Sequence, residues 1–220
     1  MRNFVVMKSI VIIAAGGVGS RFGAAVPKQF CELEGQTVLS HAIDCFRRAL
    51  PEAVVAVVID PAWQALLPGG VIAARPGATR WESVANALEA TKEVDADVIL
   101  VHDGARPLTT RPVIDAVISA LADHQGAIPV VDVTDSLRRA DGSPANRTEF
   151  RAVQTPQGFR ADLLRRAYQH PYSPEFTDDA SVMTAAGFGN IALTPGDPTN
   201  IKITNPLDLE IARVILRSRS

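Results

Sequence analysis

The sequence has few cysteines, few aromatic residues and no excess of charge of either sign. Its 220 residues include two cysteines, Cys31 and Cys45, and 5% aromatic residues, and the formal net charge is −2. Two cysteines do not build a disulfide framework; one disulfide is an alternative, but we expect two free thiols in a reducing cytoplasm. The chain also lacks the basic footprint of nucleic-acid-binding proteins, so any anion site must be local.

Long hydrophobic runs are absent as well. Lys8 interrupts the apolar N-terminal stretch MRNFVVMKSIVIIAAGG, and no segment approaches the roughly 18 apolar residues that a membrane span requires. We therefore expect neither a membrane partner nor a cleaved signal peptide. The length and the apolar fraction of 47% predict one globular domain over residues 1–220.

What the chain does contain is an alternation of short apolar runs and amphipathic segments. Continuous apolar runs predict strands buried on both faces at 9–15, 53–60, 97–105 and 126–133. Amphipathic segments predict helices at 37–50, 81–93, 111–124, 161–170 and 178–187. A strand around NIKIT (200–204) and a closing helix from Pro206 follow. This order predicts an α/β fold, with a Rossmann-like, mostly parallel sheet and helices on both faces.

Residues 134–160 break the alternation, because they are polar, charged and rich in turn-forming residues. The sequence ADGS at 140–143 is typical of the tip of a β-hairpin with an extended segment on either side. A hairpin of two strands is marginally stable alone. We therefore predict a protruding β-hairpin arm over 134–160 that packs on a second copy and makes a homodimer.

Three segments are expected beyond the carboxyl ends of the strands, where open α/β sheets bind ligands: IIAAGGVGSRFG (12–23) with the residues that follow it, HDGAR (102–106), and the loop before NIKIT. A dinucleotide fingerprint fails in the first loop because Phe22 replaces a glycine, and a P-loop fails because Gln29 follows Lys28. A tight strand–helix turn is one alternative. The other is a phosphate loop, in which glycines let backbone N–H groups approach phosphate oxygens and Arg21 and Lys28 add full charge.

The motif AGGVGSRFG…PKQF resembles the signature loop of the sugar-nucleotidyltransferase superfamily. The motifs GATRWESV, VHDGARP, DVTDSLRR, AVQTPQGF, FTDDASV and NIKIT follow in order over nearly the whole chain, and the set resembles the 2-C-methyl-D-erythritol 4-phosphate cytidylyltransferase family. The resemblance implies an enzyme of the non-mevalonate isoprenoid pathway. It would transfer a cytidylyl group from CTP to a polyol phosphate, release pyrophosphate and use Mg²⁺.

The resemblance also implies roles for numbered residues. The catalytic cations are Arg21, Lys28 and Lys202. The nucleotide contacts are Ala15, Gly16, Gly17, Gly19, Gly77, Arg80, Ser83 and Asp103, and Asp103 is also the metal ligand, since Mg²⁺ prefers carboxylate oxygen. The contacts to the alcohol phosphate are Arg106, Ser136, Arg147, Thr155, Thr177 and Lys202, with Arg147 reaching a partner's site. Arg151 is the alternative to Arg147, and Asp197 is an open candidate for a second metal ligand.

Two other functions compete with this interpretation. Ribitol-5-phosphate cytidylyltransferases look much alike, because their acceptor is also a polyol phosphate. A non-catalytic nucleotide-binding protein on the same fold is the other alternative, although such sensors usually lose a catalytic cation and this chain keeps all three. Asp178 and Asp179 are either a metal pair or negative charges at a helix N-terminus, and we favour helix charges.

Overall fold

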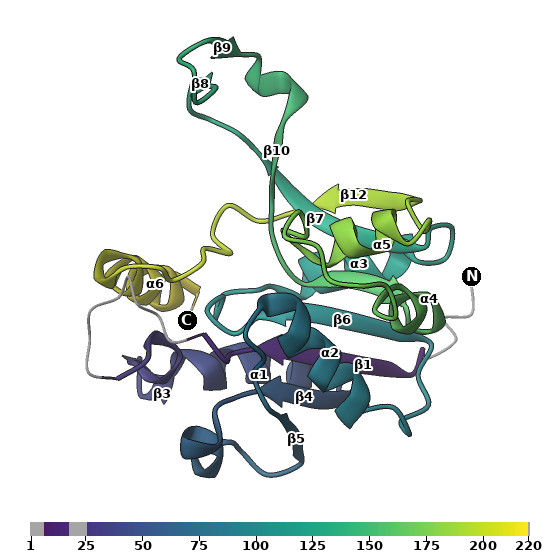
Figure 1. The fold of residues 1–220 in the computed structure, drawn as a ribbon. Helices are drawn as coiled ribbons and strands as arrows, with labels where there is room; N and C mark the ends of the chain where they lie inside the picture. The colour runs from purple at the N-terminus through teal and green to yellow at the C-terminus, as the bar shows by residue number, and fades with distance from the viewer. Residues whose placement is uncertain (1–6, 18–25, 220) are drawn as a thin grey trace, which may run out of the picture.

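The computed structural model describes residues 7–17 and 26–219. Its centre is an eight-stranded mixed sheet (Figure 1). The strands of this sheet are β1 (Ser9–Ala14), β4 (Val54–Val58), β5 (Val71–Ala74), β6 (Val98–Asp103), β7 (Gly126–Asp132), β10 (Arg151–Val153), β11 (Gln157–Arg160) and β12 (Ile191–Pro195). From one edge the order is β5, β4, β1, β6, β11 and β7, and β7 also pairs with β10 and β12. The prediction of a mostly parallel α/β sheet is confirmed.

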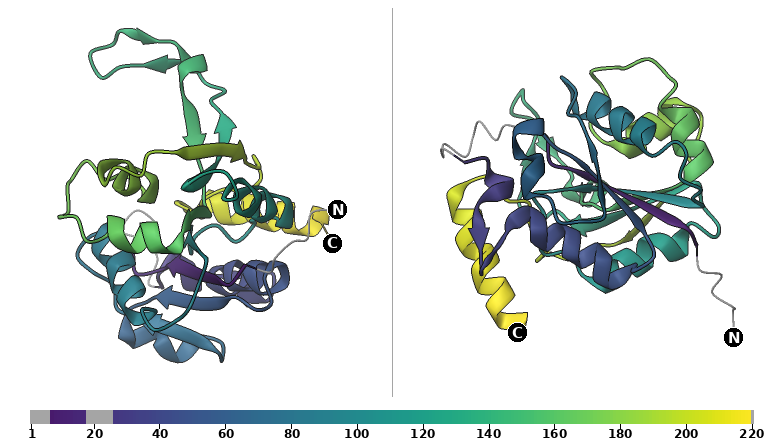
Figure 2. Two further views of the ribbon diagram at one scale, coloured as in Figure 1. Left: turned by 90° about the vertical axis from the view of Figure 1, so that its right-hand side faces the viewer. Right: turned by 90° about the horizontal axis from the view of Figure 1, so that it is seen from below.

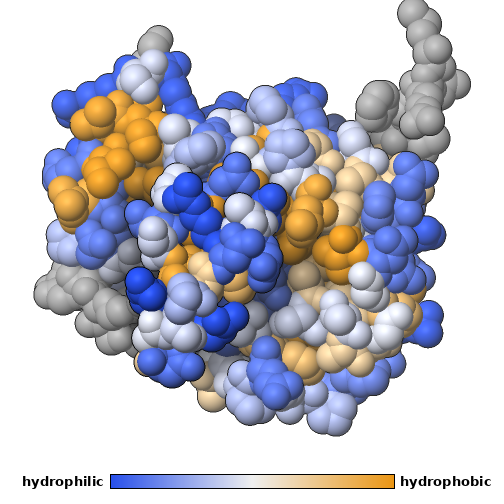
Figure 3. Space-filling model, turned by 90° about the horizontal axis from the view of Figure 1, so that it is seen from above, coloured by the Kyte–Doolittle hydropathy of each residue, from blue (hydrophilic) through white to orange (hydrophobic). Residues whose placement is uncertain are grey.

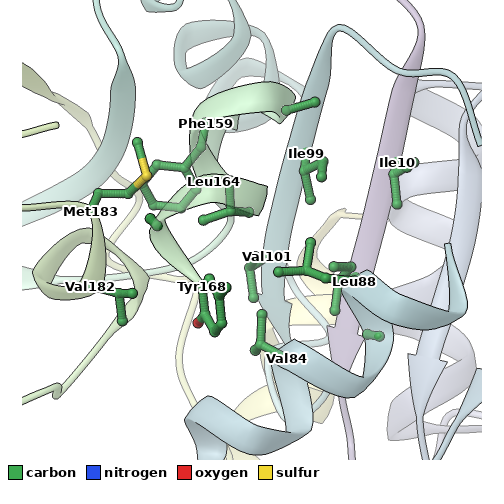
Figure 4. Close-up of a cluster of buried hydrophobic side chains, with 14 of the residues drawn as sticks. Ile10, Val84, Leu88, Ile99, Val101, Phe159, Leu164, Tyr168, Val182 and Met183 are labelled. Atoms are coloured by element: carbon green, nitrogen blue, oxygen red, sulfur yellow. The ribbon is translucent and has the colours of Figure 1, made fainter. Parts of the chain in front are cut away.

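Helices cover both faces of the sheet (Figures 1 and 2). They are α1 (Val38–Ala49), α2 (Arg80–Ala90), α3 (Arg111–Ala120), α4 (Ala161–Ala167), α5 (Asp179–Ala185) and α6 (Pro206–Arg219). Successive side chains of β1 point to opposite faces, so Ile10 and Ile12 pack with α2, α4 and α5, whereas Val11 and Ile13 pack with α1 and α3. Figure 4 shows the first of these two apolar clusters. A third, smaller cluster joins α6 to Ile203 and Leu33.

Short elements complete the described chain. They are the 3₁₀-helices η1 (Lys28–Phe30), η2 (Pro61–Leu66) and η3 (Arg147–Glu149), the pair β2 (Glu32–Leu33) and β3 (Gln36–Thr37), and the pair β8 (Leu137–Arg138) and β9 (Pro144–Ala145). None of the helices in the described ranges has the length and apolar character that crossing a bilayer requires. Cys31 and Cys45 are both free thiols, as predicted.

The predicted strand at NIKIT is wrong. Residues 201–204 belong to no sheet: the Ile203 amide donates to the carbonyl of Ala105 (2.8 Å), and its side chain packs in the α6 cluster. The last strand of the sheet is instead β12, which pairs in parallel with β7, and β5 is a further strand that the sequence analysis missed. β5 and β12 are four and five residues long and are only partly buried.

The arm projects from the sheet as a hairpin, but the predicted range 134–160 is too long (Figure 1). At its tip the Arg139 amide donates to the Ser143 carbonyl (2.9 Å), and Gly142 has a φ of +86° that suits glycine. The chain returns to the sheet from Arg151 onward, since β10 and β11 pair antiparallel with β7 and β11 also pairs with β6. Gln154 and the residues through Phe159 are buried. The projecting part therefore ends near residue 150.

Candidate active site

A cavity of about 550 Å³ opens at the carboxyl ends of β1 and β6. It brings together nine of the residues predicted from the sequence: Ala15, Gly16, Gly17, Lys28, Gly77, Arg80, Ser83, Asp103 and Lys202. Arg21 and Gly19 lie outside the described residues. The glycine loop, the start of α2, the end of β6 and the segment before α6 thus meet at one place, as the topology rule for α/β sheets predicts.

Asp103 ends β6 and is surrounded by cations. Lys202 Nζ lies 2.9 Å and Arg106 Nε 3.5 Å from its Oδ2, and Arg80 Nε lies 3.8 Å from its Oδ1. Burial opposes ionisation of the carboxyl group, but the attraction of Lys202, Arg80 and Arg106 outweighs it and holds the pKa of Asp103 well below its usual range. Asp103 is therefore a carboxylate at neutral pH, among three cations from three segments.

His102 and Thr155 hold the main chain of Asp103 from behind. The His102 ring is fully buried, and burial lowers its pKa to about 4, so the ring is neutral at pH 7. His102 Nε2 lies 3.0 Å from the Arg106 carbonyl, which only accepts, so Nε2 carries the proton and Nδ1 accepts from the Thr155 hydroxyl (3.0 Å). Thr155 Oγ1 in turn accepts from the Asp103 amide (3.0 Å). The structure places Thr155 in this buried chain; its predicted contact with the acceptor phosphate stays a prediction.

Lys202 reaches Asp103 from a segment that buried polar contacts fix in place. The fully buried Asn200 donates from Nδ2 to the Thr155 carbonyl (2.9 Å), and its Oδ1 accepts from Thr109 Oγ1 (2.9 Å). Arg106 Nη1 donates to the Asn200 carbonyl (2.7 Å). The segment is thus tied both to the chain between β10 and β11 and to the loop after β6, although it is not a strand.

Two glycines in the cavity wall allow two loops to approach closely. A Cβ at Gly16 would lie 2.5 Å from Pro76 Cβ, and a Cβ at Gly77 would lie 2.2 Å from Glu82 Cβ and 2.9 Å from its carbonyl carbon. The Gly77 amide donates to Ser83 Oγ (3.0 Å), which donates to the Thr79 carbonyl (2.9 Å). Main-chain groups of this loop therefore face the cavity in a fixed conformation.

Sequence reasoning missed two residues that support this wall. Gln29 is buried and donates from Nε2 to the carbonyls of Ala15 (2.7 Å) and Gly17 (3.2 Å), so it holds the described part of the glycine loop. Asp179 is fully buried and pairs with Arg80 (Oδ2 to Nη2, 2.6 Å). We expected Asp178 and Asp179 to be negative charges at a helix N-terminus, and both lie there: Asp178 caps α5, accepting from the Ser181 amide (2.9 Å), and Asp179 is in the first turn.

Other predicted residues lie away from the cavity of this chain. Ser136 and Arg147 are exposed on the arm, where Arg147 donates to the Thr134 carbonyl. The alternative, Arg151, pairs with Asp132 at 3.3 Å. Thr177 is exposed just before α5 and is not part of the cavity lining.

The side chains of the cavity could bind a metal ion only together with oxygen ligands from the substrate. The described residues contain no group of three or more histidine, cysteine, aspartate or glutamate side chains that could hold a metal ion. Asp197, the candidate second ligand, is engaged by the Thr199 amide and hydroxyl at Oδ1 and faces Arg219 at 3.4 Å from Oδ2. Asp103 Oδ1, by contrast, has its Arg80 partner at 3.8 Å, beyond hydrogen-bond distance. One carboxylate oxygen thus remains available, and Mg²⁺ commonly uses one carboxylate with substrate phosphates.

Comparisons with known proteins identify the family of this chain. The model of the family "2-C-methyl-D-erythritol 4-phosphate cytidylyltransferase" (IspD) matches residues 9–218. The enzyme of that name from Bacteroides thetaiotaomicron is 38% identical over 96% of this chain and 100% of its own length. A bifunctional IspD/IspF enzyme from Rhodospirillum rubrum is 41% identical over 96% of this chain, which spans 57% of that longer relative.

Solved structures show the same likeness in three dimensions. The crystal structure of 2-C-methyl-D-erythritol 4-phosphate cytidylyltransferase from Thermus thermophilus superposes with a TM-score of 0.79 at 35% identity, covering 96% of this chain and 100% of that one. The family model covers most of the chain, and the Bacteroides thetaiotaomicron relative is matched over its whole length. The chain belongs to the 2-C-methyl-D-erythritol 4-phosphate cytidylyltransferase family, a family of nucleotidyltransferases.

Proposed function

We propose that this chain transfers a cytidylyl group from CTP to 2-C-methyl-D-erythritol 4-phosphate and releases pyrophosphate. The observation that carries the proposal is the ring of charge at the carboxyl edge of the sheet. Lys28 and Lys202 line one cavity from opposite ends of the sequence, with Asp103 and main-chain groups of two glycine loops beside them. Such a cavity suits a triphosphate, whose charge it neutralises and whose base the main chain can read.

The reaction requires positioning more than covalent chemistry. An oxygen of the acceptor phosphate attacks the α-phosphorus of CTP in line, and the bond from that phosphorus to the oxygen bridging to the β-phosphate breaks, so that pyrophosphate leaves. We assign Lys28, Lys202 and Arg21 to the charge that develops on the transferred phosphoryl group. Arg106 and Lys202 would hold the acceptor phosphate on the side of Asp103.

Asp103 is the residue that we assign to the metal. Its carboxylate would hold Mg²⁺ together with triphosphate oxygens, and the ion would supply positive charge to the leaving pyrophosphate. The three cations around Asp103 keep the carboxyl group ionised and therefore ready to bind. Their positions also fix the direction in which the free carboxylate oxygen points.

We propose further that two copies share their sites through the arm. The cavity lining in the described residues includes none of 133–150, although Ser136 and Arg147 lie there. Leu207, Ile211 and Val214 form an exposed apolar stripe on α6, at the upper left in Figure 3, and Phe150 is exposed at the base of the arm. A second copy would bury such surfaces and bring its own Arg147 to this cavity.

The state of the two cysteines fits a protein that acts in a reducing compartment. Cys31 and Cys45 are free, and burial raises the pKa of both thiols, so they are protonated and unreactive at neutral pH. We therefore propose that the protein acts in the cytoplasm.

Pyrophosphate release from CTP tests the function and identifies the acceptor. We expect turnover with 2-C-methyl-D-erythritol 4-phosphate and a much lower kcat/KM with ribitol 5-phosphate, measured side by side at equal enzyme concentration. Preference for ribitol 5-phosphate would assign the chain to the alternative reaction. Absence of pyrophosphate with both acceptors would refute an enzymatic role.

The nucleobase should be selected strongly. CTP carries an amine, a hydrogen-bond donor, at position 4 of the base, where UTP carries a carbonyl, an acceptor. If main-chain carbonyls bind this position, UTP would place its own carbonyl against them and form no hydrogen bond. We expect kcat/KM for UTP to be lower by at least about 10²-fold than for CTP. Parallel steady-state assays with the two nucleotides check this, and comparable values would show that the main chain of the cavity does not read the base.

A further inference from the structure

Asp179 is a buried aspartate to which the proposed reaction assigns no role. Its side chain is 0% exposed, and a carboxylate in such a place is costly to bury unless it is paired and hydrogen-bonded. Oδ2 accepts from Arg80 Nη2 at 2.6 Å and Oδ1 accepts from the Tyr168 hydroxyl at 2.6 Å. The Asp179 amide donates to Gln157 Oε1 at 3.1 Å, which fixes the start of α5 against β11. Both oxygens therefore have strong donors from other elements.

Arg80 is the only one of these partners that reaches the cavity among the described residues. Its side chain is 32% exposed, with Nη2 held by Asp179 and Nε 3.8 Å from Asp103 Oδ1. A guanidinium is planar, so the hydrogen bond at Nη2 restricts the directions that Nη1 can take. The ion pair with Asp179 thus restricts the plane in which Arg80 can meet a ligand.

The support for Asp179 extends into the apolar core. Tyr168 ends α4, and its ring lies in the apolar cluster that α2, α4 and α5 share (Figure 4). The ring also stacks on Trp81, the neighbour of Arg80 on α2, with centroids 5.6 Å apart. Burial and the adjacent Asp179 raise the pKa of Tyr168 well above its usual value, which keeps the hydroxyl a donor. Tyr168, Asp179 and Arg80 therefore form a chain from packed core to cavity wall.

We propose that Asp179 is a positioning residue for the nucleotide: it holds the Arg80 guanidinium in the orientation that binds CTP, and Tyr168 holds Asp179. The inference rests on the proposed function, since it takes CTP as the ligand of this wall. It separates two tasks at one site. Lys202 and Arg106 lie beside Oδ2 of Asp103, whereas Arg80 faces Oδ1, so loss of Asp179 should impair nucleotide binding and spare the acceptor.

Calorimetric titration of CTP into the full chain, without acceptor, tests this role. We expect Asp179→Asn to raise the Kd for CTP by about tenfold or more, because a charge-assisted hydrogen bond to Arg80 is lost. Tyr168→Phe should raise it less, since the ion pair remains. In steady-state assays the KM for the alcohol phosphate should change by less than about twofold, because neither residue that we assign to the acceptor phosphate, Arg106 or Lys202, is a partner of Asp179.

A matched control and a double-mutant cycle distinguish positioning from general damage. Asp115→Asn breaks an exposed aspartate–arginine pair on α3 (3.3 Å from Arg111) and should leave the Kd unchanged. In an Arg80→Gln background, Asp179→Asn should add less than about twofold, because its effect acts through Arg80. Thermal unfolding of each variant shows that it is folded; if Asp179→Asn is not, the same cycle is run with Tyr168→Phe.

Several results would overturn the inference. A folded Asp179→Asn variant with the same Kd for CTP as the unsubstituted protein would show that Asp179 does not act through Arg80. So would a double variant whose increase in Kd is the product of the increases in Asp179→Asn and Arg80→Gln. An original chain that binds CTP in an Asp179-dependent way but releases no pyrophosphate would refute the proposed function and leave the positioning role in place. An original chain that does not bind CTP at all would refute both.

Discussion

Replacing Lys28 with alanine will lower kcat by about 10² to 10³-fold while the protein stays folded, because one aimed cation is lost from the transferred phosphoryl group. Lys28 begins η1 and lines the cavity, whereas the buried anchors of η1 are Gln29 and Phe30. Alanine therefore removes the charge without removing the packing of this turn. The measurement is kcat with saturating CTP and acceptor, together with the thermal unfolding midpoint.

A matched control for Lys28→Ala is Lys92→Ala. Lys92 is exposed and pairs with Glu89 at 2.6 Å on the far end of α2, so kcat should not change. Turnover close to normal in a folded Lys28→Ala protein would remove Lys28 from the catalytic machinery. Equal losses in both variants would point instead to a general effect of net charge.

Mixing two inactive variants should restore activity if the sites are shared. Lys28→Ala removes a residue of a chain's own cavity, and Arg147→Ala removes a residue that we assign to the partner's cavity. After subunit exchange, each mixed dimer contains one site with both defects and one site with neither. Random exchange at equal concentrations should therefore recover about a quarter of the original activity.

The control mixture pairs Lys28→Ala with Lys202→Ala. Both residues line the cavity of one chain, so every site in a mixed dimer keeps one defect and activity should stay absent. Exchange is verified by native mass spectrometry in both mixtures. If dimers exchange and the Lys28→Ala plus Arg147→Ala mixture stays inactive, Arg147 does not act across the interface. A monomer by mass would refute the shared site directly.

The sheet was predictable where strands are buried on both faces. Residues Ile10 to Ile13 are all apolar and buried, and such a run is visible in the sequence without knowing which strands lie beside it. At NIKIT the apolar residues pack against α6, so the same kind of signal arises without a strand. β12 was missed because its burial is partial and Leu193 is 61% exposed, and β11 because a buried Gln157 looks polar in the sequence.

The cavity residues were predictable because glycines and charged residues directly follow the strands that carry them. The partner of Arg80 was not, because the sequence cannot say which of two adjacent aspartates faces inward. Asp178 caps α5 and Asp179 turns into the core, a difference that depends on where Tyr168 and Gln157 lie. Long-range hydrogen bonds of this kind leave no local pattern.

The order of strands also constrains how the chain folds as it is synthesised. Among the described strands, the partners of β7 are β10, β11 and β12, and all three follow it in the sequence. β5, β4, β1 and β6 can pair once residue 103 has left the ribosome, but the free edge of β6 waits for β11 at 157–160. At about 5–20 residues per second this interval lasts several seconds. During translation the nascent chain therefore carries the unpaired edges of β6 and β7, which are open to binding by chaperones and to association with neighbouring nascent chains.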